Sequence, residues 1–277
     1  MMPTAIERWK AIIDARAQQT DAAFARLGRT SADFWDRRAR GFHHSTKDTT
    51  PGDPFFQHLC QAVTAQTTVL DVGAGTGRLS IALAPLVKHI IAVEPNDPMR
   101  SYLSQEVERR EISNISCVTT TWELAPADLQ ADVIICSHVL YGIRDVDTFI
   151  DRLYAATRQA CYIYMRAKHF DAINAPLWKH FHGEDRCLPP GYIHALDVMF
   201  DMGMYADVDI VHYAQHMRFS TLDVAVEEML EQLILPDDAQ TRAELRALLS
   251  SWLAERDGAL ALPANEMTAA IMRVLPG

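Results

Sequence analysis

The sequence has 277 residues, of which 49% are hydrophobic, enough for a packed core in one large domain or in a core with an attached cap. Its net charge of -10 and the lack of any Lys/Arg-rich run argue against a nucleic-acid partner, because neutralising phosphates requires clustered basic side chains. No stretch approaches the roughly 20 apolar residues of a membrane-spanning helix, so a membrane partner is not expected either.

Residues 1–53 are predicted to form a helical lid. An amphipathic pattern predicts a helix over 4–28, and cap signals before the next apolar stretch predict a second helix over 31–40. Thr, Pro and Gly residues then mark a boundary, after which an α/β domain is predicted over 54–277. A helix over 54–65 leads into this domain.

The most informative pattern lies in the stretch 68–95. Residues 69–72 read as a buried parallel strand, and an apolar pattern of helical spacing follows three alternating glycines. A second strand over 90–93 ends at Glu94. In an open α/β sheet, the carboxyl ends of such strands border the crevice in which ligands bind. The alternating glycines are Gly73, Gly75 and Gly77.

The chemistry of this pattern favours a nucleoside ligand. Glycines lack Cβ, so backbone N–H groups can approach a ligand, and the helix start adds further unpaired donors. Glu94 can accept two hydrogen bonds from a ribose diol. The spacing G-x-G-x-G places Arg78 where a dinucleotide fingerprint has its third glycine, and Asp71 would sit badly beside a pyrophosphate. A cation or a hydroxyl beside Asp71 fits better.

The next part of the chain continues to alternate between helices and strands. Helices are predicted over 97–110 and 145–157. Strands are predicted over 115–121, 131–139 and 161–166. This β-α-β-α alternation predicts a parallel, doubly wound sheet of the α/β class.

Beyond the fifth predicted strand the pattern is less regular. Residues 167–191 depart from a compact layout and are predicted to be a lid segment. Two amphipathic helices later form a helical insertion over 221–256. The elements predicted in this part are helices over 193–202, 221–235 and 238–256 and strands over 208–214 and 267–274.

The string DVGAGTG followed by AVEP closely resembles motif I and the acidic loop of class I S-adenosylmethionine-dependent methyltransferases. The resemblance extends over about residues 66–166. It implies a Rossmann-like, mostly parallel seven-stranded sheet whose last strand inserts antiparallel between the fifth and sixth. It also implies S-adenosylmethionine as the methyl donor and S-adenosylhomocysteine as the product.

The resemblance assigns cofactor contacts to individual residues. Motif I, which is Asp71 with the three glycines, would lie against the methionine part of the cofactor, and Glu94 would bind the ribose. Pro95 or Asn96 would flank the adenine. After the third strand many relatives carry an acid-Ala-Glu segment, where this chain has Thr121 and Trp122. The implied cofactor-binding residues are Asp71, Gly73, Gly75, Gly77, Glu94, Pro95, Thr121, Trp122 and Ser137.

The acceptor side is predicted at the tips of the fourth and fifth strands. His138 could be a general base, since the unperturbed pKa of histidine is about 6.5. Alternatively, it could be a packed histidine that donates a hydrogen bond to a backbone carbonyl. Tyr141 could wall the pocket or bind substrate, and Arg166 could hold a substrate carboxylate or pair with an acid. The segment from Ser137 to Tyr141 resembles the S-x-V-L-Y/H segment of methyltransferases acting on small metabolites. The N/D-P-P-Y/F signature of N-methyltransferases is absent.

Two further patterns lie in the predicted lids. A W-x-x-x-A-x-x-F/Y match resembles a segment that covers the cofactor in small-molecule methyltransferases; its residues are Trp35, Ala39 and Phe42. The pairs His43–His44 and His180-x-His182 raise the question of a metal site, but no cysteine or carboxylate cluster completes a ligand set. We predict no metal.

The patterns together predict transfer of a methyl group from S-adenosylmethionine to a small molecule. Five scattered cysteines without a CxxC pair, and a charged N-terminus without the apolar core of a secretory signal, indicate a cytoplasmic protein. We expect a monomer or homodimer. Two alternatives remain open: methyl transfer, demethylation or dehalogenation with another methyl donor and a folate-type acceptor, or a nucleoside-binding regulator without turnover.

Overall fold

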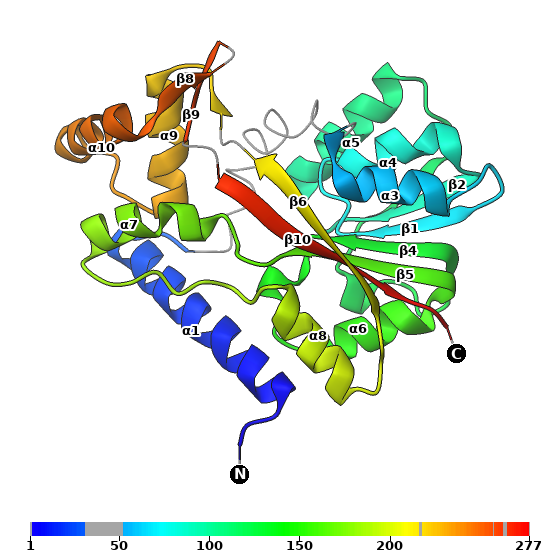
Figure 1. Cartoon of the computed structure of the whole chain (residues 1–277). Coiled ribbons are helices and arrows are strands. Elements are labelled where there is room, and N and C mark those ends of the chain that lie inside the picture. The colour runs from blue at the N-terminus through cyan, green and yellow to red at the C-terminus, as the bar shows by residue number, and fades with distance from the viewer. Residues whose placement is uncertain (1, 31–51, 216–217, 257, 263–264, 277) are drawn as a thin grey trace.

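The computed structural model describes residues 2–30, 52–215, 218–256, 258–262 and 265–276. In these parts of the chain, seven strands form the main sheet. They are β1 (Thr68–Val72), β2 (His89–Val93), β3 (Ile115–Val118), β4 (Ala131–Ser137), β5 (Thr157–Arg166), β6 (Asp207–Gln215) and β10 (Asn265–Val274). Their order across the sheet is β3-β2-β1-β4-β5-β10-β6 (Figure 1).

The first five strands are parallel, and β10 pairs antiparallel with both β5 and β6. Strand β1 lies between β2 and β4, so the strand order reverses at β1, and in open α/β sheets ligands bind at the carboxyl ends of the strands beside such a reversal. Val69 and Leu70 of β1 are fully buried, as expected for a central parallel strand covered on both faces. The predicted fold class is confirmed, including the antiparallel last strand.

Helices cover both faces of the sheet (Figure 1). One face carries α3 (Pro54–Ala62), α4 (Arg78–Leu83) and α5 (Asp97–Arg109). The other carries α1 (Ala5–Arg26), α6 (Val146–Ala155) and α8 (Tyr192–Asp201). Each layer buries its own apolar cluster against the sheet, around Phe55 and Leu59 on the first face and around Trp9 and Phe149 on the second. These clusters hold the strand ends in place.

Helix α1 is fastened to the body at several points. Thr4 and Glu7 form a capping box at its start. The buried Trp9 donates its indole N–H to the carbonyl oxygen of Ile143 (2.7 Å). The helix predicted over 31–40, with the lid match at Trp35, Ala39 and Phe42 and the pair His43–His44, lies outside the described residues. The predicted boundary at residue 53 stays a prediction.

The segment 167–191 contains a helix that the sequence did not predict. Helix α7 (Asp171–His182) encloses Pro176, a residue that usually interrupts helices because it lacks an N–H donor. Leu177 and Trp178 anchor this helix in a third apolar cluster that includes the insertion helices. Tertiary packing therefore overrides the local signal.

The insertion before β10 is also more varied than predicted. It holds α9 (Leu222–Leu233) and α10 (Ala239–Trp252), and a small sheet of order β7-β9-β8 accompanies them. The prediction of a helix up to residue 256 was wrong, because the chain becomes extended at Leu253 and pairs with β9. The small strands are β7 (Arg218–Phe219), β8 (Ala254–Arg256) and β9 (Ala259–Ala261). Within the described residues, no helix combines the length and apolarity needed to cross a membrane.

Candidate active site

The glycine turn after β1 has a backbone that few other residues could adopt. Gly73, Gly75 and Gly77 have φ of 74°, 58° and 81°, all in the left-handed region. The N–H of Gly73 donates to the carbonyl oxygen of Val93 at the end of β2 (2.8 Å). A Cβ on Gly73 would come within 2.4 Å of Val139. The turn is thus clamped between the tips of β2 and β4, as the predicted nucleoside cradle requires.

Glu94 holds this turn from the tip of β2. Its carboxylate accepts the backbone N–H of Gly75 (2.8 Å) and that of Asn96 (2.9 Å). The residue is buried, and burial raises the pKa of its carboxyl group although both N–H groups oppose the rise. Arg100 reaches the carbonyl oxygen of Glu94 (2.9 Å) from the first turns of α5. The predicted acid therefore lies at the edge of the crevice, already bonded to the turn.

Asp71 bonds within the fold. Its carboxylate accepts the hydroxyl of Ser80 (2.6 Å), which joins β1 to α4, and its side chain is almost fully buried. Burial raises the pKa of Asp71 to about 6. Of the two neighbours that the sequence suggested for Asp71, a cation or a hydroxyl, the structure has a hydroxyl, that of Ser80. Direct contact of Asp71 with the cofactor stays a prediction.

The remaining predicted cofactor residues lie around the same edge. Ser137 ends β4, and its buried hydroxyl has no hydrogen-bond partner among the described residues. Thr121 is exposed and precedes η4 (Trp122–Leu124), whereas the indole of Trp122 is buried with the guanidinium of Arg152 over it (4.6 Å). Pro95 is exposed beside Glu94. Their contacts with a ligand stay predictions.

The three predicted acceptor-side residues come together at the tips of β4 and β5. Tyr141 lies in η5 (Leu140–Gly142), and its hydroxyl accepts the backbone N–H of Arg166 (2.7 Å). The same hydroxyl is 3.1 Å from Nδ1 of His138. Arg166 is buried and donates from Nε to the hydroxyl of Tyr213 on β6 (3.1 Å). Burial raises the pKa of Tyr141 to about 12, so its hydroxyl stays protonated.

His138 has an unusual backbone for its residue type. Its φ is 62°, a left-handed value that is strained for a residue with a Cβ, and such strain often marks functional sites. Its N–H donates to the carbonyl oxygen of Tyr164 (2.9 Å). Burial, followed by the nearby charge of Arg166, lowers the pKa of His138 well below its usual value. The role of His138 as a general base stays a prediction: the ring is neutral, and its hydrogen-bonding contact among the described residues is the hydroxyl of Tyr141.

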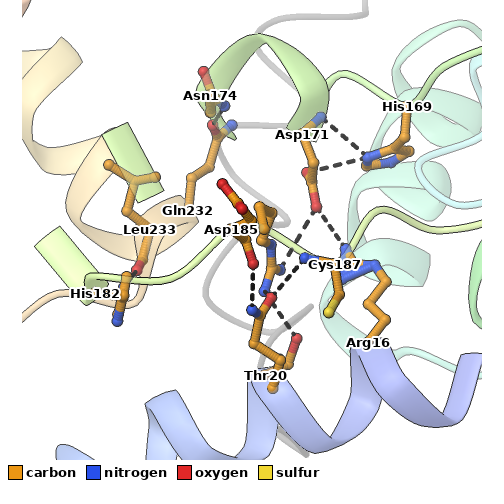
Figure 2. Close-up of polar contacts among 12 residues, drawn as sticks. Arg16, Thr20, His169, Asp171, Asn174, His182, Asp185, Cys187, Gln232 and Leu233 are labelled. Carbon is orange, nitrogen blue, oxygen red and sulfur yellow. Dashed lines mark hydrogen bonds and ion pairs between the residues drawn. The ribbon is translucent and has the colours of Figure 1, made fainter. Parts of the chain in front are cut away.

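The structure adds a residue that the sequence analysis did not single out. His169 follows β5, and its ring stands edge-on to that of Tyr141, with centroids 4.9 Å apart. Its Nδ1 is 3.1 Å from a carboxylate oxygen of Asp171, the first residue of α7 (Figure 2). A His-x-Asp pattern just after a strand is the only sequence signal, and it is too common to be selective.

Other histidines lie away from this edge. His180 is exposed, with Nε2 2.7 Å from Glu244 on α10, and His182 stacks on Trp178 with ring centroids 3.9 Å apart. Within the described residues, no group of three or more His, Cys, Asp or Glu side chains could hold a metal ion.

Comparison with known sequences defines the class. The family model for a methyltransferase domain matches residues 70–165. An uncharacterized protein of Haemophilus influenzae is 25% identical over 183 residues, which are 64% of this chain and 65% of that protein. The uncharacterized methyltransferase YcgJ of Bacillus subtilis is 30% identical over 83 residues, which are 30% of this chain and 33% of that protein. The chain thus spans less than two thirds of the length of either relative.

Solved structures share the fold. The YcgJ protein of Bacillus subtilis matches with a TM-score of 0.54 and 14% identity, over 80% of this chain and 97% of that chain. Magnesium protoporphyrin IX methyltransferase (ChlM) of Synechocystis PCC 6803, solved with bound S-adenosylhomocysteine (SAH), matches with a TM-score of 0.53 and 14% identity, over 95% of this chain and 100% of that chain. Residues 70–165 therefore match a methyltransferase domain, and the chain shares the fold of these solved proteins. These matches support the predicted family, enzyme class and cofactor.

The site residues fit S-adenosylmethionine on structural grounds. The glycine turn leaves no room for a Cβ at Gly73, and Glu94 lies at the edge where a ribose diol would bind. The buried, unpartnered hydroxyl of Ser137 would gain a partner from a ligand at the tip of β4. The cofactor supplies an electrophilic methyl group, and the protein binds and orients the two reactants.

Proposed function

We propose that this protein transfers the methyl group of S-adenosylmethionine to a small-molecule acceptor. One observation carries the proposal: the glycine turn bonded to Glu94 and the group of His138, Tyr141 and Arg166 lie at the same carboxyl edge of the sheet. A methyl donor in the turn would thus lie near an acceptor held at the tips of β4 and β5. The Glu94 carboxylate, which the glycine turn holds in place, would bind the ribose of the nucleoside.

The acceptor side favours a small ligand over a polymer. Arg166 and His169 are each only 9% exposed, so an acceptor must enter the protein to reach them. The net charge of -10 also disfavours a phosphate backbone. Arg166 would hold a carboxylate or another polar group of the acceptor, and Tyr141 would form a wall of its pocket.

We also propose a cytoplasmic location and a monomeric or homodimeric state. All five cysteines are free thiols, which suits a reducing compartment. Light scattering during size-exclusion chromatography would measure the state, and a tetramer or larger species would contradict this part.

Calorimetric titration is the first test of the proposed function. S-adenosylmethionine and S-adenosylhomocysteine should bind, whereas NAD, the control, should not. A screen of small hydroxyl, amine and carboxylate compounds, with total RNA in parallel, should then yield a small product heavier by one methyl group. Binding without methylation of any compound would favour the non-catalytic regulator. Methyl transfer from a different donor to a folate would favour the other alternative.

A further inference from the structure

The pair of His169 and Asp171 lies on the acceptor side of the site. His169 faces the ring of Tyr141, whose hydroxyl receives the N–H of Arg166. The imidazole of His169 thus lies beside Tyr141, the residue predicted to wall the acceptor pocket. Asp171 approaches the same imidazole from the start of α7, with its Oδ1 3.1 Å from Nδ1.

Asp171 is held as an anion by cations from two other elements. Figure 2 shows contacts from Asp171 to both His169 and Arg16. Arg16 of α1 lies 2.8 Å from its Oδ2, and Arg186, which stacks over Trp178, lies 3.6 Å from the same oxygen. Burial alone would raise the pKa of Asp171, but His169 and these two arginines hold it well below its usual range. The carboxylate is therefore charged throughout the neutral range.

The charge of Asp171 determines which nitrogen of His169 carries the proton. The backbone N–H of Asp171 also approaches Nδ1 (3.3 Å), so this N–H competes with the carboxylate for that nitrogen. The carboxylate is closer, and a charge-assisted hydrogen bond is about twice as strong as a neutral one. The proton therefore lies on Nδ1, between the ring and the carboxylate, and Nε2 keeps its lone pair.

His138 does not have this arrangement. No carboxylate is among its contacts with the described residues, and its Nδ1 meets the hydroxyl of Tyr141. That hydroxyl also accepts the N–H of Arg166, and its contact with Nδ1 can run in either direction, depending on the tautomer of His138. Unlike His169, His138 thus has no neighbouring anion, within the described part of the chain, that fixes the proton on one ring nitrogen.

We propose that His169, oriented by Asp171, is the general base of the reaction and that the acceptor is a hydroxyl compound; this rests on the function proposed above. The acceptor oxygen forms a bond to the methyl carbon while the carbon–sulfur bond breaks toward sulfur. The hydroxyl proton passes to Nε2 of His169 and then to solvent. A hydroxyl keeps its proton at neutral pH and needs such a base, whereas a carboxylate acceptor needs none.

The base is in the correct state at neutral pH. Burial lowers the pKa of His169 below its usual value, although Asp171 opposes this shift, so the ring is neutral at pH 7. Turnover should fall only as the pH drops through that lowered pKa. The titratable or charged groups that face His169 are Tyr141 on η5, Asp171 on α7, Arg166 on β5, Arg16 on α1 and His138 after β4.

Nitrogen-15 NMR of the histidine rings in the full-length protein tests the orientation without any acceptor. His169→Gln identifies the signals by their loss. We expect the Nδ1–H tautomer for His169 and a titration midpoint below the usual value of a histidine. An Nε2–H tautomer for His169 would overturn the proposal.

Turnover tests the role itself, with 4-hydroxybenzoate and phenol as probe acceptors beside any hydroxyl compound found in the screen. His169→Gln should lower kcat about 100- to 10,000-fold and remove the acidic limb of the pH profile, while S-adenosylhomocysteine binds as before. His180→Gln, the matched control, should leave kcat and the pH profile unchanged. Wild-type turnover in His169→Gln, or transfer only to carboxylates, would overturn the proposal. Failure of the wild-type protein to bind S-adenosylhomocysteine would instead contradict the proposed function, and the NMR result would stand separately.

Discussion

The two sides of the site are built by different means. The cofactor side comes from the continuous stretch 68–95 and is shaped by backbone, with N–H groups of the glycine turn bonded to the tip of β2. The acceptor side joins side chains from distant segments; Arg16 and Asp171, for example, are 155 positions apart. Mutations on the first side should therefore act through backbone geometry, and those on the second side through lost partners of single side chains.

The largest effect is expected where the backbone tolerates no side chain. Gly73→Ala should lower the free energy of unfolding by about 2–5 kcal/mol, because left-handed strain adds to a contact with Val139. Gly28→Ala is the control: its φ is 64°, but a Cβ there would meet nothing within 4 Å. It should lose only about 1–2 kcal/mol. Equal losses in urea unfolding would show that the Gly73 turn is not tightly clamped.

Glu94→Gln tests the cofactor side by affinity. The neutral amide loses charge-assisted hydrogen bonding, so cofactor binding should weaken by about 1–3 kcal/mol. Glu108→Gln, an exposed change on α5, should leave the affinity unaltered. Calorimetry with S-adenosylhomocysteine compares the two variants, and an unchanged affinity for Glu94→Gln would contradict the ribose role.

Tyr141→Phe tests the acceptor side by stability. It removes the hydroxyl that accepts the N–H of the buried Arg166, which should cost about 1–2 kcal/mol in the free energy of unfolding. Tyr205→Phe removes a hydroxyl from a side chain that is 76% exposed and should change little. If both variants unfold at the same urea concentration, the bond between Tyr141 and Arg166 contributes no stability.

The smallest effect concerns the pH dependence of Asp71. The folded protein binds the carboxyl proton near pH 6 and the unfolded chain near its ordinary value of 3.8, so acidification through this window stabilises the folded state. Between pH 7 and pH 5 this group should contribute about 1 kcal/mol. Asp71→Asn should lack that gain, so its stability relative to wild type should decline on acidification. Parallel pH profiles in urea unfolding would contradict the raised pKa.

The parts of the structure that could be predicted from sequence also differ between the cofactor side and the rest of the molecule. The turn, its glycines and Glu94 were located from spacing alone, because a strand, a tight turn and a helix are local structures. Helix α7 was missed because Pro176 normally argues against a helix interior. The strand β8 was missed because its pairing with β9 depends on a partner strand rather than on its own pattern.

The sheet, the glycine turn and the preference for a nucleoside ligand could be predicted from sequence. These follow from short-range periodicity and from backbone donors that only glycine can bring close to a ligand. The meeting of Arg16, Asp171 and His169 beside Tyr141 depends on the packing of the folded chain. No local pattern encodes that meeting, because it depends on how α1 and α7 pack on opposite sides of a shared polar cluster. The electrostatic character of the acceptor side is therefore a property of the fold.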